Sequence, residues 1–225
     1  MKTNNTLFLI FCSCFAFVSC GLQGCAKQSS FEKALKSLSK HDLHSTNGYD
    51  YSIKQYYGSE IVNSKSIQLR AKFDNGTQAK KIVKTKCLND FGHGEQFSLT
   101  ETTTFFKNNQ ICEFANGLWV WRTYNESEFL QTDLSSFSLN ERYFINISET
   151  NLQSDLKFTA DISSNYINDV LGNDADGISE LKLTLVVKND YSLIKSLSFT
   201  YNQQTTNSEI SFVSIFDAGV IDFPA

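Results

Sequence analysis

The side chains that could perform chemistry in this chain are few and scattered. His41 and His44 are three positions apart, which would put two imidazoles on one face of a helix, but no third ligand accompanies them. His93 lies between two glycines, and Asp174-Ala-Asp176 matches only part of a calcium loop. The chain contains no nucleophile elbow, phosphate-binding loop or zinc-protease motif. We therefore expect no enzyme, no bound metal and no cofactor.

The cysteines fall into two groups. Four of the six lie in the first 25 residues: Cys12 and Cys14 within an apolar run, and Cys20 and Cys25 after it. Cys87 and Cys112 stand alone in the later part of the chain, without the close pairing typical of zinc sites. The sequence leaves two alternatives open for them: a disulfide, which is permitted outside the cytoplasm, or two separate buried thiols.

The N-terminus has the layout of a secretory signal peptide. Lys2 is the only charge in the first 26 residues, and residues 7–18 (LFLIFCSCFAFV) are apolar without interruption. That run of 12 residues is shorter than the roughly 20 that cross a bilayer. A charged start followed by a short apolar run and small residues is typical of a signal peptide.

Two cysteines after this run resemble the lipidation site of bacterial lipoproteins. Residues 17–20 (FVSC) and 22–25 (LQGC) each place a small residue before a cysteine. The resemblance implies that the cysteine receives a diacylglyceryl group and becomes the first residue of the mature chain. We predict Cys20, directly after the apolar run, with Cys25 as the alternative; a cleaved signal peptide without lipid is the remaining interpretation. The predicted organisation is a signal peptide at 1–19, a lipidated tether at 20–29 and one domain at 30–225.

Composition limits the partners of this domain. The 225 residues carry a net charge of −4 and contain no basic block, so nucleic acid is not an expected partner. Aromatic residues make up 13% of the chain, enough to build a packed core.

The sequence of the domain predicts one helix followed by strands. Ser29 and Glu32 form a capping box, and apolar residues at helical spacing predict a helix over Ser30–Leu43, ended by Asn47-Gly48. Alternation of period two then predicts strands, most clearly at Ile67–Phe73, with Leu69 inside and Arg70 outside. Further strands are predicted at Tyr49–Tyr56, Gln78–Cys87, Gln96–Phe106, Gln110–Ala115, Leu118–Tyr124, Tyr143–Ser148, Leu156–Asp161, Ile178–Val187, Ser192–Asn202 and Ser208–Phe216. The fold class is therefore mainly β (α+β): one large curved antiparallel sheet, or half-open barrel, of about eleven strands, with the N-terminal helix on its concave face.

Aromatic side chains mark a candidate binding surface. Trp119 and Trp121 are two positions apart and share a strand face, and Phe97, Leu99 and Phe105 lie on a nearby strand. They either build the core beneath the helix or line a pocket for an apolar ligand in the part of the concave face that one helix cannot cover.

These features resemble the LolA/LppX-like envelope lipoproteins and lipid carriers. The resemblance rests on a helix after a lipoprotein signal, the hairpin at 103–111 (TTFFKNNQI), the following 116–119 (NGLW) and the tail at 209–224 (EISFVSIFDAGVIDFP). It implies a lipoprotein anchored outside the cytoplasm to the bacterial cell membrane, with a half-open barrel that binds or carries a lipid or another acylated molecule, including an acylated protein. The tail departs from the family pattern at Asp217-Ala218. The alternative is a surface-exposed interaction lipoprotein with a filled core and no ligand.

Overall fold

The computed structural model describes residues 28–38, 45–88, 97–130, 139–171, 177–203 and 206–224. The predicted signal peptide, Cys20, Cys25, the three histidines and Asp174-Ala-Asp176 lie outside these residues. The chain divides into two compact units, Met1–Ser30 and Phe31–Ala225, and the second contains the sheet.

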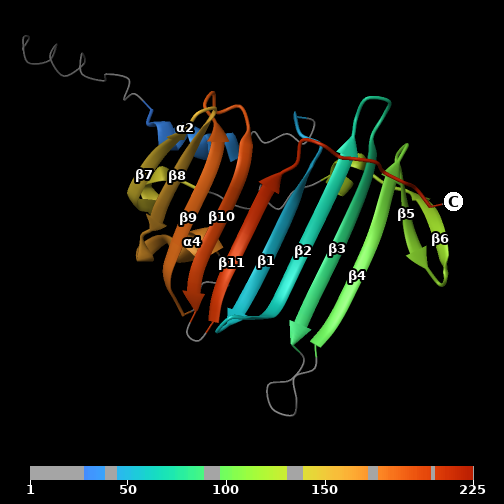
Figure 1. Ribbon diagram of the computed structural model, residues 1–225, viewed down its shortest axis with the longest axis horizontal. Coiled ribbons are helices and arrows are strands. Elements are labelled where there is room, and N and C mark those ends of the chain that lie inside the picture. The colour runs from blue at the N-terminus through green and yellow to red at the C-terminus, as the bar shows by residue number, and fades with distance from the viewer. Residues whose placement is uncertain are drawn as a thin grey trace, which may run out of the picture. The chain divides into compact units, whose positions relative to one another are not determined.

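The described residues form a single open antiparallel sheet of eleven strands (Figure 1). Its order is β6-β5-β4-β3-β2-β1-β11-β10-β9-β8-β7, so β6 and β7 are the two edges. The first six strands run outward from the centre, and the last five return from the other edge to pair β11 with β1. The strands are β1 (Gly48–Tyr57), β2 (Glu60–Lys72), β3 (Gln78–Leu88), β4 (Phe97–Lys107), β5 (Gln110–Ala115), β6 (Leu118–Thr123), β7 (Phe144–Leu152), β8 (Asp155–Ile162), β9 (Ile178–Lys188), β10 (Ile194–Gln203) and β11 (Thr206–Ser214). All the predicted strands and the predicted fold class are confirmed.

Short turns connect many of these strands, as the sequence predicts. Asn108 and Asn109, between β4 and β5, have φ of 53° and 56°, and Asn116 and Gly117, between β5 and β6, have φ of 51° and 85°. Two consecutive residues with positive φ form the type of turn whose twist matches that of a hairpin. A glycine is also required at position 48, the first residue of β1, where φ is 133°. Any other residue would place its Cβ 2.0 Å from the carbonyl oxygen of Leu69.

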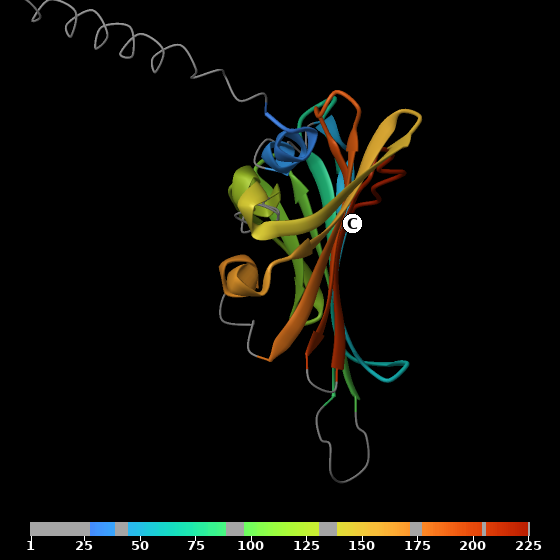
Figure 2. The ribbon, with the colours of Figure 1, turned by 90° about the vertical axis from the view of Figure 1, so that its left-hand side faces the viewer.

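Helices lie against one face of the sheet (Figure 2). The helix α2 (Ser30–Leu38) begins where it is predicted to begin, and the predicted continuation to residue 43 lies outside the described residues. Its Phe31 packs against Phe144 and Phe158, with ring centroids 5.1 and 5.5 Å apart. On the same face, Phe129 of α3 (Glu126–Leu130) stacks on Phe106 at 5.2 Å. The other helical segments are α4 (Ile167–Leu171) and the 3₁₀ turns η3 (Glu141–Tyr143) and η4 (Ser164–Tyr166).

The face beneath these helices, called here the covered face, is filled by the protein's own side chains. They form one apolar cluster drawn from both halves of the sheet and from α2, α3 and α4. The largest side chains with almost no exposed area are Phe106, Phe158, Phe199, Phe212, Leu69, Leu181, Leu183, Leu185, Ile194, Leu197 and Val187. Burying each contributes about 1.5–3 kcal/mol to folding. Every member of the cluster lies between Phe31 and Phe212, so a chain beginning at Ala26 contains the whole described core.

None of the helices among the described residues is long and apolar enough to span a bilayer.

Candidate functional site

The predicted ligand-binding residues lie on the outer face of the sheet, which we define as the face opposite the helices. Phe106 is in the core beneath α3, so its strand neighbour Phe105 points to the other side. Strand pairing places Cys112 opposite Phe105, Trp121 opposite Cys112, and Trp119 opposite Phe114. The same alternation along β4 places Phe97 and Leu99 on the outer face.

This arrangement corrects one expectation. Trp119 and Trp121 share a face, as their spacing predicts, but that face is not the one covered by α2. Alternation along a strand separates two faces without showing which of them the rest of the chain will cover. A pocket beside these residues must therefore open on the outer face.

Five rings on this face form an aromatic cluster: Phe105, Phe114, Trp119, Trp121 and Phe223. Trp119 makes edge contacts with Phe105 and Phe114, each with ring centroids 5.4 Å apart. Phe223 lies 5.7 Å from Phe105 and 6.2 Å from Trp121. Phe105 is 5% exposed, whereas Trp121 is 38% and Phe114 61% exposed, so the cluster has a buried centre and an open margin.

The C-terminal tail brings Phe223 to this cluster. After β11 ends at Ser214, the chain crosses the outer face without forming a helix or a strand (Figure 1). The start of the tail is held by hydrogen bonds: the Ile215 N–H donates to the Gly48 carbonyl at 2.9 Å, and Asn47 Nδ2 donates to the Phe216 carbonyl at 2.6 Å. Sequence reasoning missed Phe223, because nothing in the pattern of a tail shows which strands it will cross.

A hollow of about 800 Å³, called here the outer hollow, opens beside the cluster. β5 pairs with β4 only over Thr104–Lys107, whereas β3 pairs with all of β4. The hollow lies beside the part of β4 that has no pairing with β5. It is lined by Lys80, Glu101, Thr102, Thr103, Thr104, Phe105, Glu113, Phe114, Ala115 and Trp119. Of the predicted residues, Phe105 and Trp119 line it, while Trp121, Phe97 and Leu99 do not.

The charged groups of the hollow are largely paired. Glu101 forms an ion pair with Lys84 at 3.1 Å, and Glu113 forms one with Arg122 at 3.0 Å. The Lys80 ammonium lies 5.5 Å from the centroid of Phe105, where the ring face attracts a cation. The hollow thus combines aromatic walls with one cation and with threonine side chains from both faces of β4, of which Thr103 shares the face of Phe105.

The two cysteines of the domain are separate thiols. Cys87 of β3 points to the same side of the sheet as the helices and is exposed there. Cys112 of β5 points to the opposite, outer face and is fully buried. β4 lies between the two strands, so the side chains cannot meet. Burial raises the pKa of the Cys112 thiol, and the charge of Glu113 raises it further. The thiols are therefore unbonded, but the alternative of two buried thiols holds only for Cys112, because Cys87 is exposed.

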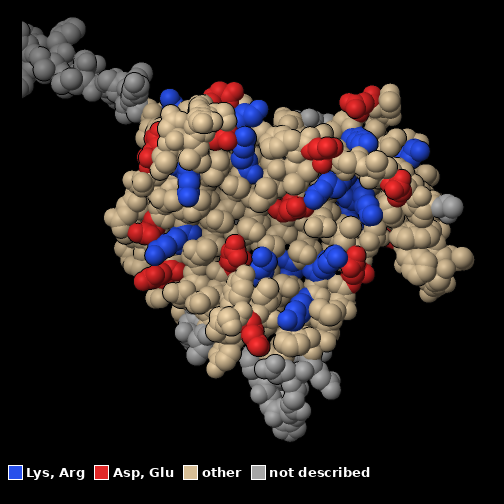
Figure 3. All heavy atoms as spheres, viewed as in Figure 1, with Lys and Arg blue, Asp and Glu red and all other residues tan. Residues whose placement is uncertain are grey.

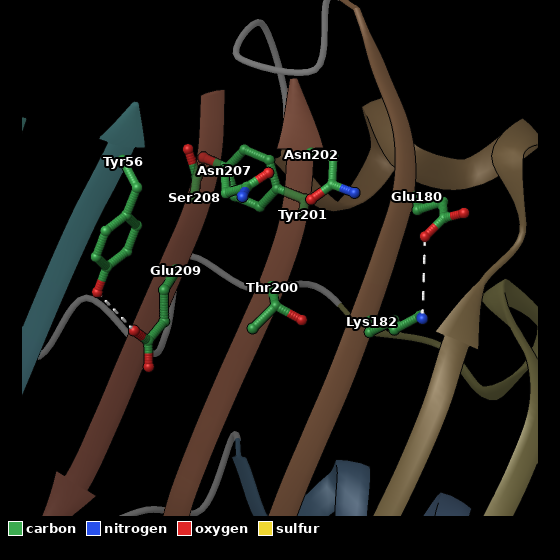
Figure 4. A pocket seen from close by; sticks show the side chains of 9 residues that line it. All are labelled: Tyr56, Glu180, Lys182, Thr200, Tyr201, Asn202, Asn207, Ser208 and Glu209. Atoms are coloured by element: carbon green, nitrogen blue, oxygen red, sulfur yellow. Dashed lines mark hydrogen bonds and ion pairs between the residues drawn. The ribbon is translucent and has the colours of Figure 1, made fainter. Parts of the chain in front are cut away.

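A second hollow, of about 310 Å³, lies on the outer face of the other half of the sheet (Figure 4). Its walls are polar: the Tyr56 hydroxyl donates to Glu209 Oε2 at 3.3 Å, and Glu180 lies 3.9 Å from Lys182. Burial raises the pKa of Tyr56, and the charge of Glu209 and its hydrogen bond raise it further. A third hollow, of about 540 Å³, lies between α2 and β7. Among the described residues, no three potential ligands come together to hold a metal ion.

Comparison with known proteins gives a limited result. No known protein family matches the chain, and no curated protein matches its sequence. Among solved structures, the fold is similar to the crystal structure of LprF from Mycobacterium bovis, at 10% sequence identity and a TM-score of 0.38. That comparison covers 86% of this chain and 96% of LprF. A similarity of this size assigns neither a family nor a ligand, and the LolA/LppX-like resemblance stays a prediction.

Proposed function

We propose that this protein is an extracytoplasmic lipoprotein that binds an apolar or amphiphilic ligand in the outer hollow. The observation that carries the proposal is the hollow itself, whose wall is formed by Phe105, Phe114 and Trp119. Its volume of about 800 Å³ lies within the range of small-molecule sites, roughly 300–1,000 Å³. Binding pockets typically combine such apolar walls with a few polar groups that orient the ligand.

The chemistry of the lining defines the ligand class. Aromatic rings provide a large apolar contact area, which suits an acyl chain or another extended hydrocarbon. Lys80 and Thr103 supply one positive charge and one hydroxyl at the same wall, so a polar end of the ligand has partners there. No grouping of nucleophile, base and orienting side chain accompanies the lining residues, and we propose binding rather than catalysis.

Attachment to the membrane is the other part of the proposal, and its support is the sequence. A short apolar run precedes Cys20 and Cys25, and each cysteine follows a small residue. Two acyl chains on either cysteine would hold the protein at the outer surface of the bacterial cell membrane.

A second candidate is an interaction lipoprotein without a small ligand. The observation that favours it is the covered face, where the protein's own apolar side chains occupy the space between sheet and helices except for the third hollow, beside α2 and β7. The two candidates differ in whether the outer hollow takes up an apolar molecule.

Tryptophan fluorescence of the chain beginning at Ala26 separates the two candidates. The chain has two tryptophans, Trp119 and Trp121, and both belong to the aromatic cluster, so their emission reports on this site. We expect saturable changes on titration with a fatty acid and with a lysophospholipid, at micromolar concentrations.

The matched variants are Thr103→Phe, which fills the outer hollow, and Thr159→Phe, which adds the same ring to the outer face of β8. Thr103→Phe should weaken binding about tenfold or more, equivalent to about 1.4 kcal/mol or more. Thr159→Phe should leave binding unchanged. Absence of saturable binding, together with no lipid in the purified protein, would favour the interaction lipoprotein.

A further inference from the structure

The outer face carries a concentration of positive charge over β2, β3 and β4 (Figure 3). Strand pairing puts six cationic side chains on this part of the face and one carboxylate, Glu101, which pairs with Lys84. Asp50 of the adjacent strand β1 pairs with Arg70, so four of the six cations have no carboxylate partner in an ion pair among the described residues. We call these six residues the basic patch: Arg70, Lys72, Lys80, Lys84, Lys86 and Lys107. The whole chain has a net charge of −4, so the patch reflects the placement of lysines rather than the composition.

Large apolar side chains are exposed around the basic patch. Leu99 is 75% exposed at one end of β4, and Phe114 is 61% exposed on β5. Trp121 on β6 is 38% exposed, and Val220 of the tail is 80% exposed. The strand residues point to the outer face, which the tail also crosses. Exposed apolar side chains gathered on one face mark an interaction surface more often than scattered ones do.

Several lysines of the patch lie over aromatic rings. The ammonium groups of Lys86 and Lys107 are 3.9 Å and 5.3 Å from the ring centroids of Phe97 and Phe223. Lysine has an apolar stem and a charged end, so it can accompany aromatic side chains into a bilayer interface while its ammonium stays at the phosphates. Aromatic rings beside lysines are the combination that membrane interfaces favour.

We propose that the outer face of β2–β6 docks on a lipid bilayer that carries anionic headgroups. The basic patch would neutralise headgroup charge, and Leu99, Phe114, Trp121 and Val220 would enter the interface. Positive charge alone would also suit an acidic protein, but the exposed leucine, valine and aromatic side chains between the lysines favour a lipid surface. Docking is a separate property from ligand binding. If both hold, the outer hollow would open toward the bilayer, because its aromatic wall belongs to the same face.

The test uses the chain beginning at Ala26, which lacks both candidate lipidation cysteines, so vesicle binding must come from the folded unit. Vesicles of brominated phosphatidylcholine are compared with vesicles that also contain brominated phosphatidylglycerol. We expect the protein to sediment with the anionic vesicles, with quenching of Trp119 and Trp121, and to be released by salt. Equal binding to neutral vesicles, or sedimentation without quenching, would overturn the proposal.

Paired variants test the charge contribution. Lys72→Gln with Lys107→Gln removes two charges of the basic patch and should weaken binding to anionic vesicles by about tenfold or more. Lys157→Gln with Lys182→Gln removes two charges from the outer face of β8 and β9 and should have little effect. A loss of similar size in both pairs would show that net charge, not this face, controls binding.

A second pair tests the apolar contribution. Leu99→Ser with Val220→Ser should reduce quenching, whereas Ile145→Ser with Leu152→Ser, on the edge strand β7, should not. All four side chains are at least 44% exposed, so the variants should fold. Thr103→Phe, which fills the outer hollow, should still dock, which separates failure of docking from failure of ligand binding. Binding of polyglutamate without any vesicle binding would refute the lipid surface and assign the patch to an acidic protein.

Discussion

At the scale of single residues, the two thiols of the domain differ in their access to solvent. Cys112 is fully buried on β5, among the rings of the aromatic cluster, and Cys87 is exposed on β3. The thiolate is the reactive form, and the pKa of Cys112 is raised by burial and by Glu113. Cys112 is therefore both shielded from solvent and kept in its less reactive form.

We predict that the native chain beginning at Ala26 is alkylated by iodoacetamide at Cys87 about tenfold or more faster than at Cys112. Peptide mass spectrometry at neutral pH measures the two rates separately. In denaturant the rates should become similar, which serves as the control. Two unreactive cysteines that become reactive only after reduction would show a disulfide and contradict the structure.

The spacing of Trp119 and Trp121 predicts a shared strand face, and the pairing with Phe114 and Cys112 agrees. The side of the sheet on which they lie could not be predicted, because it depends on which face the distant helices α2 and α3 cover. Phe223 could not be predicted either, since its contacts with Phe105 and Trp121 bring together residues more than 100 positions apart.

At the scale of elements, the register of β2 is tested by two adjacent residues. Leu69 is fully buried in the core, and Arg70 lies on the outer face, with Nη1 2.7 Å from Asp50 Oδ1. Leu69→Asp would bury a carboxylate among apolar side chains and should lower the free energy of unfolding by about 3 kcal/mol or more, or prevent folding. Arg70→Gln removes a partly exposed ion pair and should cost less than about 1 kcal/mol.

Urea denaturation of the two variants and the parent chain measures this difference. Glutamine at position 70 is the informative control because it keeps a polar side chain without placing a second carboxylate beside Asp50. Similar losses of stability in the two variants would mean that β2 presents the other face to the core.

The elements themselves could largely be predicted. Alternation of period two locates the strands, and asparagine and glycine pairs locate turns, because both signals depend only on neighbouring residues. The short pairing of β5 with β4 has no such local signal. Phe97–Thr103 has the composition of a strand whether or not β5 pairs with it. The outer hollow beside it therefore could not be predicted from the sequence.

At the scale of the whole molecule, the two ends of the strand sequence pair with each other in the middle of the open sheet. β1 pairs with β2 on one side and with β11 on the other, so the first and last strands of the sheet meet at its centre. The tail then crosses the outer face and places Phe223 on Phe105 of β4. The outer hollow is therefore lined by strands from the first half of the chain, and the tail contacts one of its lining residues, Phe105.

Attachment to the membrane is the whole-molecule property that the sequence predicts most specifically. Replacing both Cys20 and Cys25 by serine removes the only thiols in the two lipobox-like segments, at 17–20 and 22–25. We predict that the doubly substituted full-length protein takes up no radiolabelled palmitate in bacterial cells and is released from the membrane fraction by a high-salt wash, because attachment that resists salt needs the acyl chains.

The single substitutions identify the cysteine used. Cys20→Ser should abolish labelling and Cys25→Ser should preserve it if Cys20 is the first residue of the mature chain; the reverse result would assign Cys25. Cys87→Ser is the matched control, because it removes an exposed cysteine of the folded unit and should leave labelling unchanged. Palmitate in the doubly substituted protein would contradict the lipoprotein assignment. Loss of palmitate with full retention at anionic membranes would instead show that the outer face alone is sufficient to hold the protein there.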